Sequence, residues 1–269
     1  MSTPVTVGVD AGATLCKLVC LTAELETAVL PAGDVRRVRE WIESWKPDRL
    51  MATGGGAAAL GQRLADVAVE RVAEFEAWAR GAPLLAERMG LALPPCYLLV
   101  SLGTGTSVLA IREGRAERVG GTALGGGTLL GLARLLLDTP SFDAVARLAE
   151  RGDRTDVDLL VGDIYPEGEA PLPAGLTAAS FAKLASRRPE DLAHALVGLV
   201  GENIALLCGG LGRACGAAAI VYGGSTLMGN AALERVLSVT TVASGLPACF
   251  LAQGAFCGAV GAALLGAAR

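Results

Sequence analysis

Two segments far apart in the sequence share one layout: a strand pattern, a turn rich in glycine and hydroxyl residues, and a second strand pattern. The first turn reads Asp10-Ala-Gly-Ala-Thr-Leu-Cys-Lys17, and the second reads Ser101-Leu-Gly-Thr-Gly-Thr-Ser107. Strand, short glycine turn and strand together predict a β-hairpin. The pair is more specific than either hairpin alone. It predicts a duplicated α/β fold whose two turns face one nucleotide.

The first turn carries a carboxylate, a hydroxyl and an ammonium group, at Asp10, Thr14 and Lys17. Backbone N–H groups at such a hairpin tip can surround phosphates, and the carboxylate would face a hydrated Mg²⁺. An ordinary Asp/Gly turn is the alternative, because these residues also favour turns with no ligand.

A third polar segment begins at Arg118, and its glycine-dense run from Gly120 to Thr128 ends in an apolar helix pattern. Glycine lets the backbone approach a bound group closely, and the first turn of a helix offers unpaired N–H groups. Together they predict a phosphate or anion site, to which Arg118 adds a planar cation. A flexible glycine loop before a core helix remains the alternative.

Glu74 stands where the alternating pattern of residues 67–72 gives way to the helical pattern of residues 77–89. A carboxylate at a strand-to-helix switch is well placed for base chemistry next to a ligand. A glutamate at a helix N-terminus also interacts with the helix dipole alone, which is the other interpretation. A continuous helix to Leu85 is an alternative to the strand.

Two further glycine turns follow predicted strands. Residues 53–56 follow the strand Arg49–Ala52, and Gly223-Gly-Ser-Thr226 follows the strand Ala217–Tyr222. A Gly-Gly-Ser strand end lets a base or ribose lie against the backbone.

Composition narrows the class of protein. A chain of 269 residues with a net charge of −4 and a pI of about 5.2 is large enough for two lobes and gives no indication of nucleic-acid binding. No unbroken apolar run reaches about 18 residues and no signal peptide is evident, so we expect a cytoplasmic protein away from membranes.

The seven cysteines form no CxxC pair and predict buried thiols, with a metal–sulfur site as the alternative. His194, the only histidine, lies in a helical stretch and is expected to have a surface or capping role.

Seven motifs extend over nearly the whole chain: DAGATLCK (10–17), ATGGG (52–56), EFEA (74–77), RVGGTALGGGT (118–128), VGDIYP (161–166), GLTAASF (175–181) and GAFCGAVGA (254–262). In this order the chain resembles the type II pantothenate kinases of the actin/hexokinase/Hsp70 ATPase superfamily. The resemblance implies a two-lobed actin-like ATPase fold, a duplicated ribonuclease H-like fold with an interlobe nucleotide cleft. We expect an N-terminal lobe at residues 1–94 and a C-terminal lobe at residues 95–269.

The resemblance also implies a homodimer that uses ATP and Mg²⁺ to phosphorylate pantothenate in the first step of coenzyme A synthesis. Glu74 would be the general base, Arg118 would contact both pantothenate and the transferring phosphoryl group, and Asp10 would hold the metal through water. Further pantothenate contacts would come from Ser107, Thr177 and Phe250. The expected ATP-binding residues are Asp10, Ala11, Gly12, Ala13, Thr14, Leu15, Cys16, Lys17, Thr104, Gly125, Gly126, Gly127, Thr128, Leu129, Phe142 and Ser225.

This sequence departs from the family pattern at two of these motifs. Ala13 replaces the usual second glycine of the first turn, and Glu76 replaces the usual aspartate after the base. Two other functions stay open: a kinase of an amino sugar or another hydroxylated metabolite, and an ATP-driven activator that carries an iron–sulfur cluster on Cys208 and Cys215 at a dimer axis.

Overall fold

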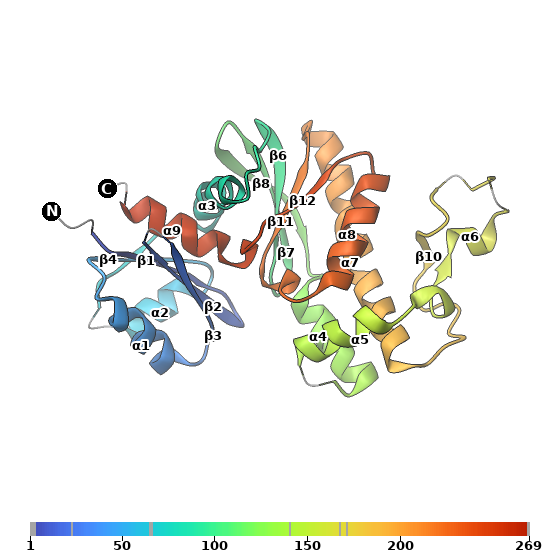
Figure 1. Cartoon of the computed structure of the whole chain (residues 1–269), viewed down its shortest axis with the longest axis horizontal. Helices are drawn as coiled ribbons and strands as arrows, with labels where there is room; N and C mark the ends of the chain where they lie inside the picture. The colour runs from blue at the N-terminus through green and yellow to red at the C-terminus, as the bar shows by residue number, and fades with distance from the viewer. Residues whose placement is uncertain are drawn as a thin grey trace.

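The computed structural model describes residues 4–22, 24–64, 67–139, 141–166, 168–170 and 172–267. Its framework is a pair of five-stranded sheets with the same plan (Figure 1). The first sheet has the order β3-β2-β1-β4-β5 and consists of β1 (Thr6–Ala11), β2 (Leu15–Leu21), β3 (Leu25–Pro31), β4 (Arg49–Thr53) and β5 (Val69–Arg71). The second has the order β12-β11-β6-β7-β8 and consists of β6 (Cys96–Leu102), β7 (Thr106–Arg112), β8 (Arg115–Thr122), β11 (Ile220–Gly223) and β12 (Ala248–Phe250).

In each sheet a three-strand antiparallel meander is continued by two parallel strands. β1 pairs antiparallel with β2 and parallel with β4, and β6 pairs in the same way with β7 and β11. The two predicted hairpins therefore occupy equivalent places in the two sheets. This confirms the predicted two-lobed, duplicated α/β fold.

Helices fill three layers around the sheets (Figure 1). α1 (Val35–Trp45) and α2 (Ala57–Arg63) cover the outer face of the first sheet. α3 (Glu74–Arg88) and α9 (Cys257–Ala267) pack on each other between the sheets. The other long helices lie on the far side of the second sheet: α4 (Gly126–Leu137), α5 (Phe142–Arg151), α7 (Pro189–Cys215) and α8 (Ala231–Ala243).

The contact between α3 and α9 is unusually close because each helix presents glycine to the other. A Cβ on Gly81 would overlap the carbonyl group of Cys257, and one on Gly261 would overlap the carbonyl group of Ala77. α9, the last helix of the chain, also packs across β1 and β4, so the C-terminus returns to the first sheet. The lobe division at residue 94 stays a prediction, and a lobe built around the first sheet would also include α9.

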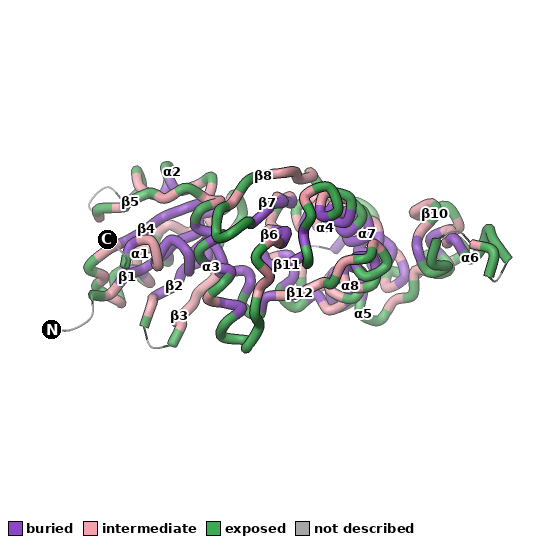
Figure 2. Tube along the Cα trace, turned by 90° about the horizontal axis from the view of Figure 1, so that it is seen from above, coloured by how far each residue is buried: buried purple, intermediate pink, exposed green. Residues whose placement is uncertain are grey.

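Figure 2 shows the buried segments concentrated in the two sheets and the helices that flank them. The small apolar residues Ala77, Ala82, Ala259 and Val260 are fully buried in the α3–α9 layer, which joins the cores of the two sheets. α7 is long and apolar enough to cross a membrane by length and composition. However, 67% of its most apolar window is buried inside the fold, as in the core helix of a globular protein.

Several local predictions differ from the structure. β3 was not predicted, and Arg118 to Thr122, expected to be loop, belongs to β8. The alternative of a continuous helix to Leu85 is wrong, because β5 separates α2 from α3. The VGDIYP motif includes a short helix, α6 (Val161–Ile164), which lies in the chain between the paired strands β9 (Leu159–Leu160) and β10 (Thr177–Ala179).

Candidate active site

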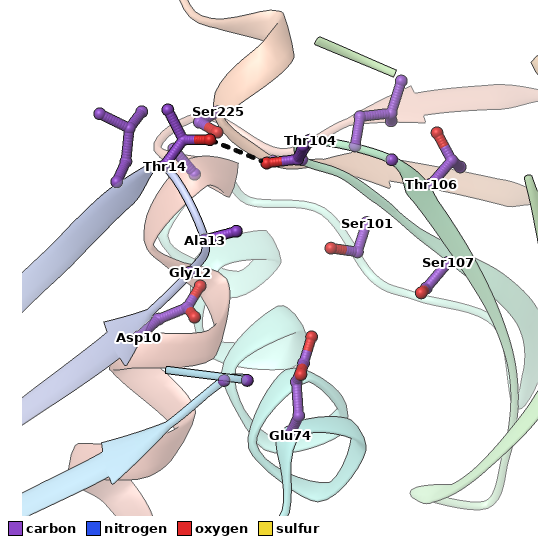
Figure 3. A pocket seen from close by; sticks show the side chains of 18 of the residues that line it. Asp10, Gly12, Ala13, Thr14, Glu74, Ser101, Thr104, Thr106, Ser107 and Ser225 are labelled. Atoms are coloured by element: carbon purple, nitrogen blue, oxygen red, sulfur yellow. Dashed lines mark hydrogen bonds between the residues drawn. The ribbon is translucent and has the colours of Figure 1, made fainter. Parts of the chain in front are cut away.

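The two hairpin turns face each other across a cleft of about 440 Å³ between the lobes (Figure 3). The Thr14 hydroxyl of the first turn lies 3.1 Å from the Thr104 hydroxyl of the second turn. Both turns thus border one space, as the paired motifs predict.

Asp10 lies at the base of the cleft near the end of β1, directly opposite Lys17 on β2. This cross-strand register places the Lys17 Nζ atom 3.3 Å from the Asp10 Oδ2 atom, and both side chains are buried. Burial raises the pKa of the Asp10 carboxyl group, and the charge and hydrogen bond of Lys17 partly offset this rise. Gly54, at a φ of +88°, lets the turn after β4 approach the same carboxylate, because a Cβ there would be 2.6 Å from Asp10 Oδ1.

Glu74 is the first residue of α3 and follows Ala73, whose extended backbone ends the strand segment. Its half-buried carboxylate points into the cleft between Asp10 and the serines of the second sheet (Figure 3). Burial is the main cause that raises the pKa of Glu74; the charge of Asp10 raises it further, and Lys17 lowers it. A carboxylate with a raised pKa in a polar cleft is suited to accept a proton.

Arg118 enters the cleft from β8, the edge strand of the second sheet. The pairing register between β7 and β8 shifts next to it, since Val108 pairs with Gly120 and Leu109 pairs with Arg118. Such a bulge re-aims side chains at the edge of a sheet. Arg118 therefore brings a positive charge from the second sheet into the cleft.

Ser107 lines the same wall of the cleft, and its direct cross-strand partner is Ser101. Of these two serines, only Ser107 is a predicted substrate contact. The hairpin register is the signal that would have found Ser101, because residues paired in a hairpin share one face of the sheet.

A second cavity of about 370 Å³ continues the cleft, and Thr14, Leu15, Gly103, Thr104 and Ser225 line both spaces. Its remaining lining is largely apolar and comes mainly from α4, from the start of α5 and from the segment that follows β11: Gly126, Gly127, Leu130, Ser141, Phe142, Asp143, Thr226 and Met228, with Val29 of β3. A polar cleft that opens into a more apolar space suits a phosphate chain with an attached base.

The glycines at the start of α4 have a role that differs from the prediction. The N–H groups of Gly126 and Gly127 donate to the carbonyls of Gly103 and Thr104, both at 2.9 Å. A Cβ on Gly125 would lie 2.7 Å from the Cα of Gly105. The expectation of unpaired amides is therefore wrong for Gly126 and Gly127, because α4 packs tightly against the second turn and supports it.

Some predicted ligand residues lie outside the cleft. The side chains of Cys16 and Leu129 are buried in the cores of the two lobes, and Ala11 is also buried, so these residues have only backbone atoms to offer a nucleotide. The Thr128 hydroxyl donates to the carbonyl of Ala123.

The two substrate contacts predicted far along the chain are also elsewhere. Thr177 is on β10, at the end of the molecule opposite the first sheet, and the ring of Phe250 stacks on Tyr222 with 5.2 Å between centroids (Figure 1). Neither residue is among those that line the cleft.

Trp78, one turn after Glu74 on α3, lines the cleft and was not predicted. Its indole lies where Gly258 brings α9 against Asp10: a Cβ on Gly258 would be 2.9 Å from Trp78 Nε1 and 3.2 Å from Asp10 Oδ2. Asp10, Trp78 and Gly258 come together only in the folded chain, so no local sequence pattern predicts that Trp78 lines the cleft.

The donor set of the cleft fits a hard, hydrated cation better than a metal cluster. No group of three or more His, Cys, Asp or Glu side chains that could hold a metal occurs within the described residues. Asp10 offers a single carboxylate, which suffices for Mg²⁺ because this ion keeps several of its waters. Cys208 is fully buried in the second lobe, and burial raises the pKa of its thiol to about 12. It is therefore not placed to bind iron at an axis shared with a second copy.

Comparisons with known proteins agree with this geometry. A family model described as Fumble matches residues 86–265. Over 266 residues the chain is 33% identical to a protein of Staphylococcus aureus (strain MRSA252) named type II pantothenate kinase, covering 97% of this chain and 99% of the relative. The chain belongs to the type II pantothenate kinase family.

Solved structures at lower identity share the fold. An activator of 2-hydroxyisocaproyl-CoA dehydratase from Clostridium difficile, with bound ADPNP, is 15% identical with a TM-score of 0.65, over 98% of this chain and 94% of that one. A ROK family glucokinase from Streptomyces griseus, in complex with glucose and AMPPNP, is 14% identical with a TM-score of 0.57, over 97% and 98%. Kinases and a dehydratase activator thus share this architecture, so the fold alone does not separate the functions.

Proposed function

We propose that this chain transfers the γ-phosphoryl group of ATP to the terminal hydroxyl of pantothenate. The product is 4′-phosphopantothenate, and the reaction is the first step of coenzyme A synthesis. The observation that carries the proposal is the position of Glu74, a carboxylate with a raised pKa that faces the space between two phosphate turns. Family membership supports pantothenate as the acceptor.

In the proposed reaction Glu74 accepts the hydroxyl proton as the hydroxyl oxygen attacks the γ-phosphorus and the bond to ADP breaks. Arg118 stabilises the charge on the transferring phosphoryl group and orients the acceptor. Phosphoryl transfer depends mainly on positioning and electrostatics, so these groups and the two turns are sufficient. Asp10 would hold Mg²⁺ through water, and the ion would neutralise charge on the ATP oxygens.

ATP would occupy both cavities. Its phosphates would lie between Thr14 and Thr104, and its base would enter the apolar space beside Phe142 and Ser225. The solved structures with ADPNP and AMPPNP support this use of the fold.

A homodimer is part of the proposal, because Thr177 and Phe250 lie away from the cleft of their own chain. A second copy would supply them. The segment of residues 164–184, which includes Thr177, carries four large apolar side chains that are between 42% and 56% accessible, as expected of a contact surface: Ile164, Tyr165, Leu172 and Leu184. Light scattering tests this point, and a monomer under assay conditions would contradict it.

Localisation in the cytoplasm also belongs to the proposal. All seven cysteines are free thiols, and thiols persist in a reducing compartment.

The experiment is ATP turnover with and without pantothenate, with the mass of the product measured. Glu74→Gln is expected to lower turnover by about 10²–10⁴-fold, the usual range for a general base, with ATP binding nearly unchanged. Glu76→Gln is the matched control, since Glu76 lies in the same helical turn but is exposed. Near-normal turnover in Glu74→Gln would exclude Glu74 as the base, and phosphorylation of a different hydroxylated metabolite would exclude the substrate.

A further inference from the structure

Trp78 carries a polar group in the cleft to which the proposed reaction gives no role. The side chain is only 4% exposed and belongs to the core between the two sheets. A purely apolar ring would fill this place in the core as well. The indole N–H is therefore the feature that needs an explanation, since buried polar groups in folded proteins nearly always have a partner.

The indole N–H of Trp78 has no acceptor among the described residues, yet it is not sealed inside the core. Its nitrogen is not one of the enclosed polar atoms that lack a partner, which in the described part of the chain are Thr6 Oγ1, Tyr97 OH, Asp158 Oδ2 and Asn230 Nδ2. Because Trp78 lines the cleft, the space that its nitrogen reaches is the cleft itself. The N–H is an unpaired donor at the wall of the cleft.

Two glycines fix the direction of this N–H. A Cβ on Gly258 of α9 would lie 2.9 Å from Trp78 Nε1 and 3.2 Å from Asp10 Oδ2, so the nitrogen and the carboxylate border the same space. A Cβ on Gly223, at the end of β11, would lie 3.3 Å from Trp78 Cζ3, on the opposite edge of the ring. Backbone thus confines both edges of the indole, and the N–H is directed to the Asp10 end of the cleft.

The Asp10 carboxylate is not the acceptor of this N–H. Its Oδ2 atom accepts a hydrogen bond from Lys17 Nζ at 3.3 Å, and no hydrogen bond joins Asp10 to the indole in the described structure. An acceptor for the N–H therefore comes from outside the chain.

The place of Trp78 in the cleft indicates which part of a bound nucleotide it meets. Trp78 lines the polar cleft but not the apolar cavity proposed for the base, and Thr14 and Thr104 border both spaces. It also lies one turn after Glu74 on α3, so the two side chains share one face of the helix. With the phosphates between the two threonines, the group beyond them and next to Glu74 is the terminal phosphoryl group.

We propose that Trp78 is a further binding residue of the cleft, whose indole N–H donates to an oxygen of the terminal phosphoryl group of the nucleotide. The inference rests on the proposed function, because it takes ATP as the phosphoryl donor and Glu74 as the residue beside the transferred group. Hydrogen bonds to anionic oxygens are the stronger ones, and an indole supplies such a bond without adding a charge beside Asp10.

The test is the affinity of the full chain for nucleotides, measured by calorimetry in the presence of Mg²⁺. Trp78→Phe keeps an aromatic ring and removes the donor. We expect it to raise the Kd for AMPPNP, which has a terminal phosphoryl group, about 10- to 100-fold, the range of one hydrogen bond to a charged group. The Kd for ADP, which lacks this group, should stay nearly unchanged.

Leu85→Ala is the matched control on α3. Leu85 is buried in the same core cluster as Trp78 and does not line the cleft, so this change loosens the packing of α3 and leaves the indole N–H in place. It should lower the Tm and leave the Kd for AMPPNP unchanged. If Leu85→Ala weakens the binding of AMPPNP as much as Trp78→Phe does, loss of packing explains the effect and the inference is wrong.

A second variant covers the case in which Trp78→Phe does not fold. Incorporation of β-(3-benzothienyl)alanine at position 78 keeps the shape of the indole and replaces the N–H by sulfur. It is expected to give the same rise in the Kd for AMPPNP, and an unchanged Kd would overturn the inference.

The outcomes separate the inference from the proposed function. Binding of AMPPNP without phosphorylation of pantothenate would reject the acceptor and leave the inference intact. An equal rise of the Kd for ADP and for AMPPNP, or no rise for either, would reject the placement of the N–H at the terminal phosphoryl group. If Trp78→Phe changes only the KM for pantothenate, the N–H contacts the acceptor instead and the inference is also wrong.

Discussion

Gly261→Ala tests whether the close contact between α3 and α9 sets both the stability of the protein and the geometry of its site. The added methyl group would overlap the Ala77 carbonyl and lie 2.9 Å from the Ala77 Cα. These are backbone atoms, so no flexible side chain can move aside. The two helices must separate instead.

The expected change in the free energy of unfolding is the difference between two opposing effects. Overpacking a closely packed core costs ~1–3 kcal/mol, whereas replacing glycine by alanine within a helix contributes ~0.5–1 kcal/mol of stability. Because the overlap involves only backbone, we expect a net loss of about 2 kcal/mol, which lowers the Tm of a chain of this size by roughly 4–8 °C. Glu74 begins α3, so the same displacement should lower turnover. A misplacement of ~1 Å can cost ~100-fold in rate.

The measurements are thermal unfolding and pantothenate-dependent turnover, with Gly131→Ala as the control. Gly131 lies on an exposed part of α4, and a Cβ there would meet nothing within 4 Å. The control should therefore gain ~0.5–1 kcal/mol from helix propensity alone and keep its activity. If Gly261→Ala matches this control in both Tm and turnover, the reasoning about the α3–α9 contact is refuted.

Three further predictions concern the cleft. In the proposed mechanism Glu74 accepts a proton only when it is deprotonated, so kcat/KM should fall as the pH falls through its raised pKa. Lys17→Met removes a charge that lowers this pKa, so it should move the acidic limb of the pH profile to higher pH. An unmoved limb would contradict the role of Glu74 as the base. Asp10→Asn should raise the Mg²⁺ concentration needed for half-maximal activity, and an unchanged Mg²⁺ titration would remove Asp10 from the metal site. Phe142→Ala should raise the KM for ATP about 10-fold, as the loss of ~1.4 kcal/mol of aromatic contact would; a shift in the KM for pantothenate alone would place the base elsewhere.

The parts of the site that the sequence predicts are those encoded by contiguous residues. The turn from Asp10 to Lys17 needs only its own hairpin to bring a carboxylate and an ammonium group together, since these residues are cross-strand partners. Glu74 was located by the change from alternating to helical periodicity, and α3 does begin at this residue. Local geometry is sufficient in both cases.

The parts that were missed depend on pairing between strands. β8 contains three charged residues and two glycines, a composition that disfavours a strand on its own, and it forms because β7 offers hydrogen bonds along its full length. The same pairing includes Gly120 and Gly121, although a glycine-rich sequence of this kind predicts a loop. Pairing with β7 thus outweighs the low intrinsic strand propensity of residues 115–122.

α9 shows that small residues predict close helix packing but do not predict which element the helix packs against. The GAFCGAVGA motif (254–262) is rich in small residues, and in the structure it leads into α9, which contacts β1, β4 and α3. Its first turn lies behind Asp10, where a side chain on Gly258 would meet both the carboxylate and the indole of Trp78. α9 therefore packs behind a cleft whose two carboxylates, Asp10 and Glu74, come from the first sheet and from α3. Substitutions at Gly258 or Gly261 should reduce both activity and stability, because the packing that joins the lobes also sets the distance between Asp10 and Glu74.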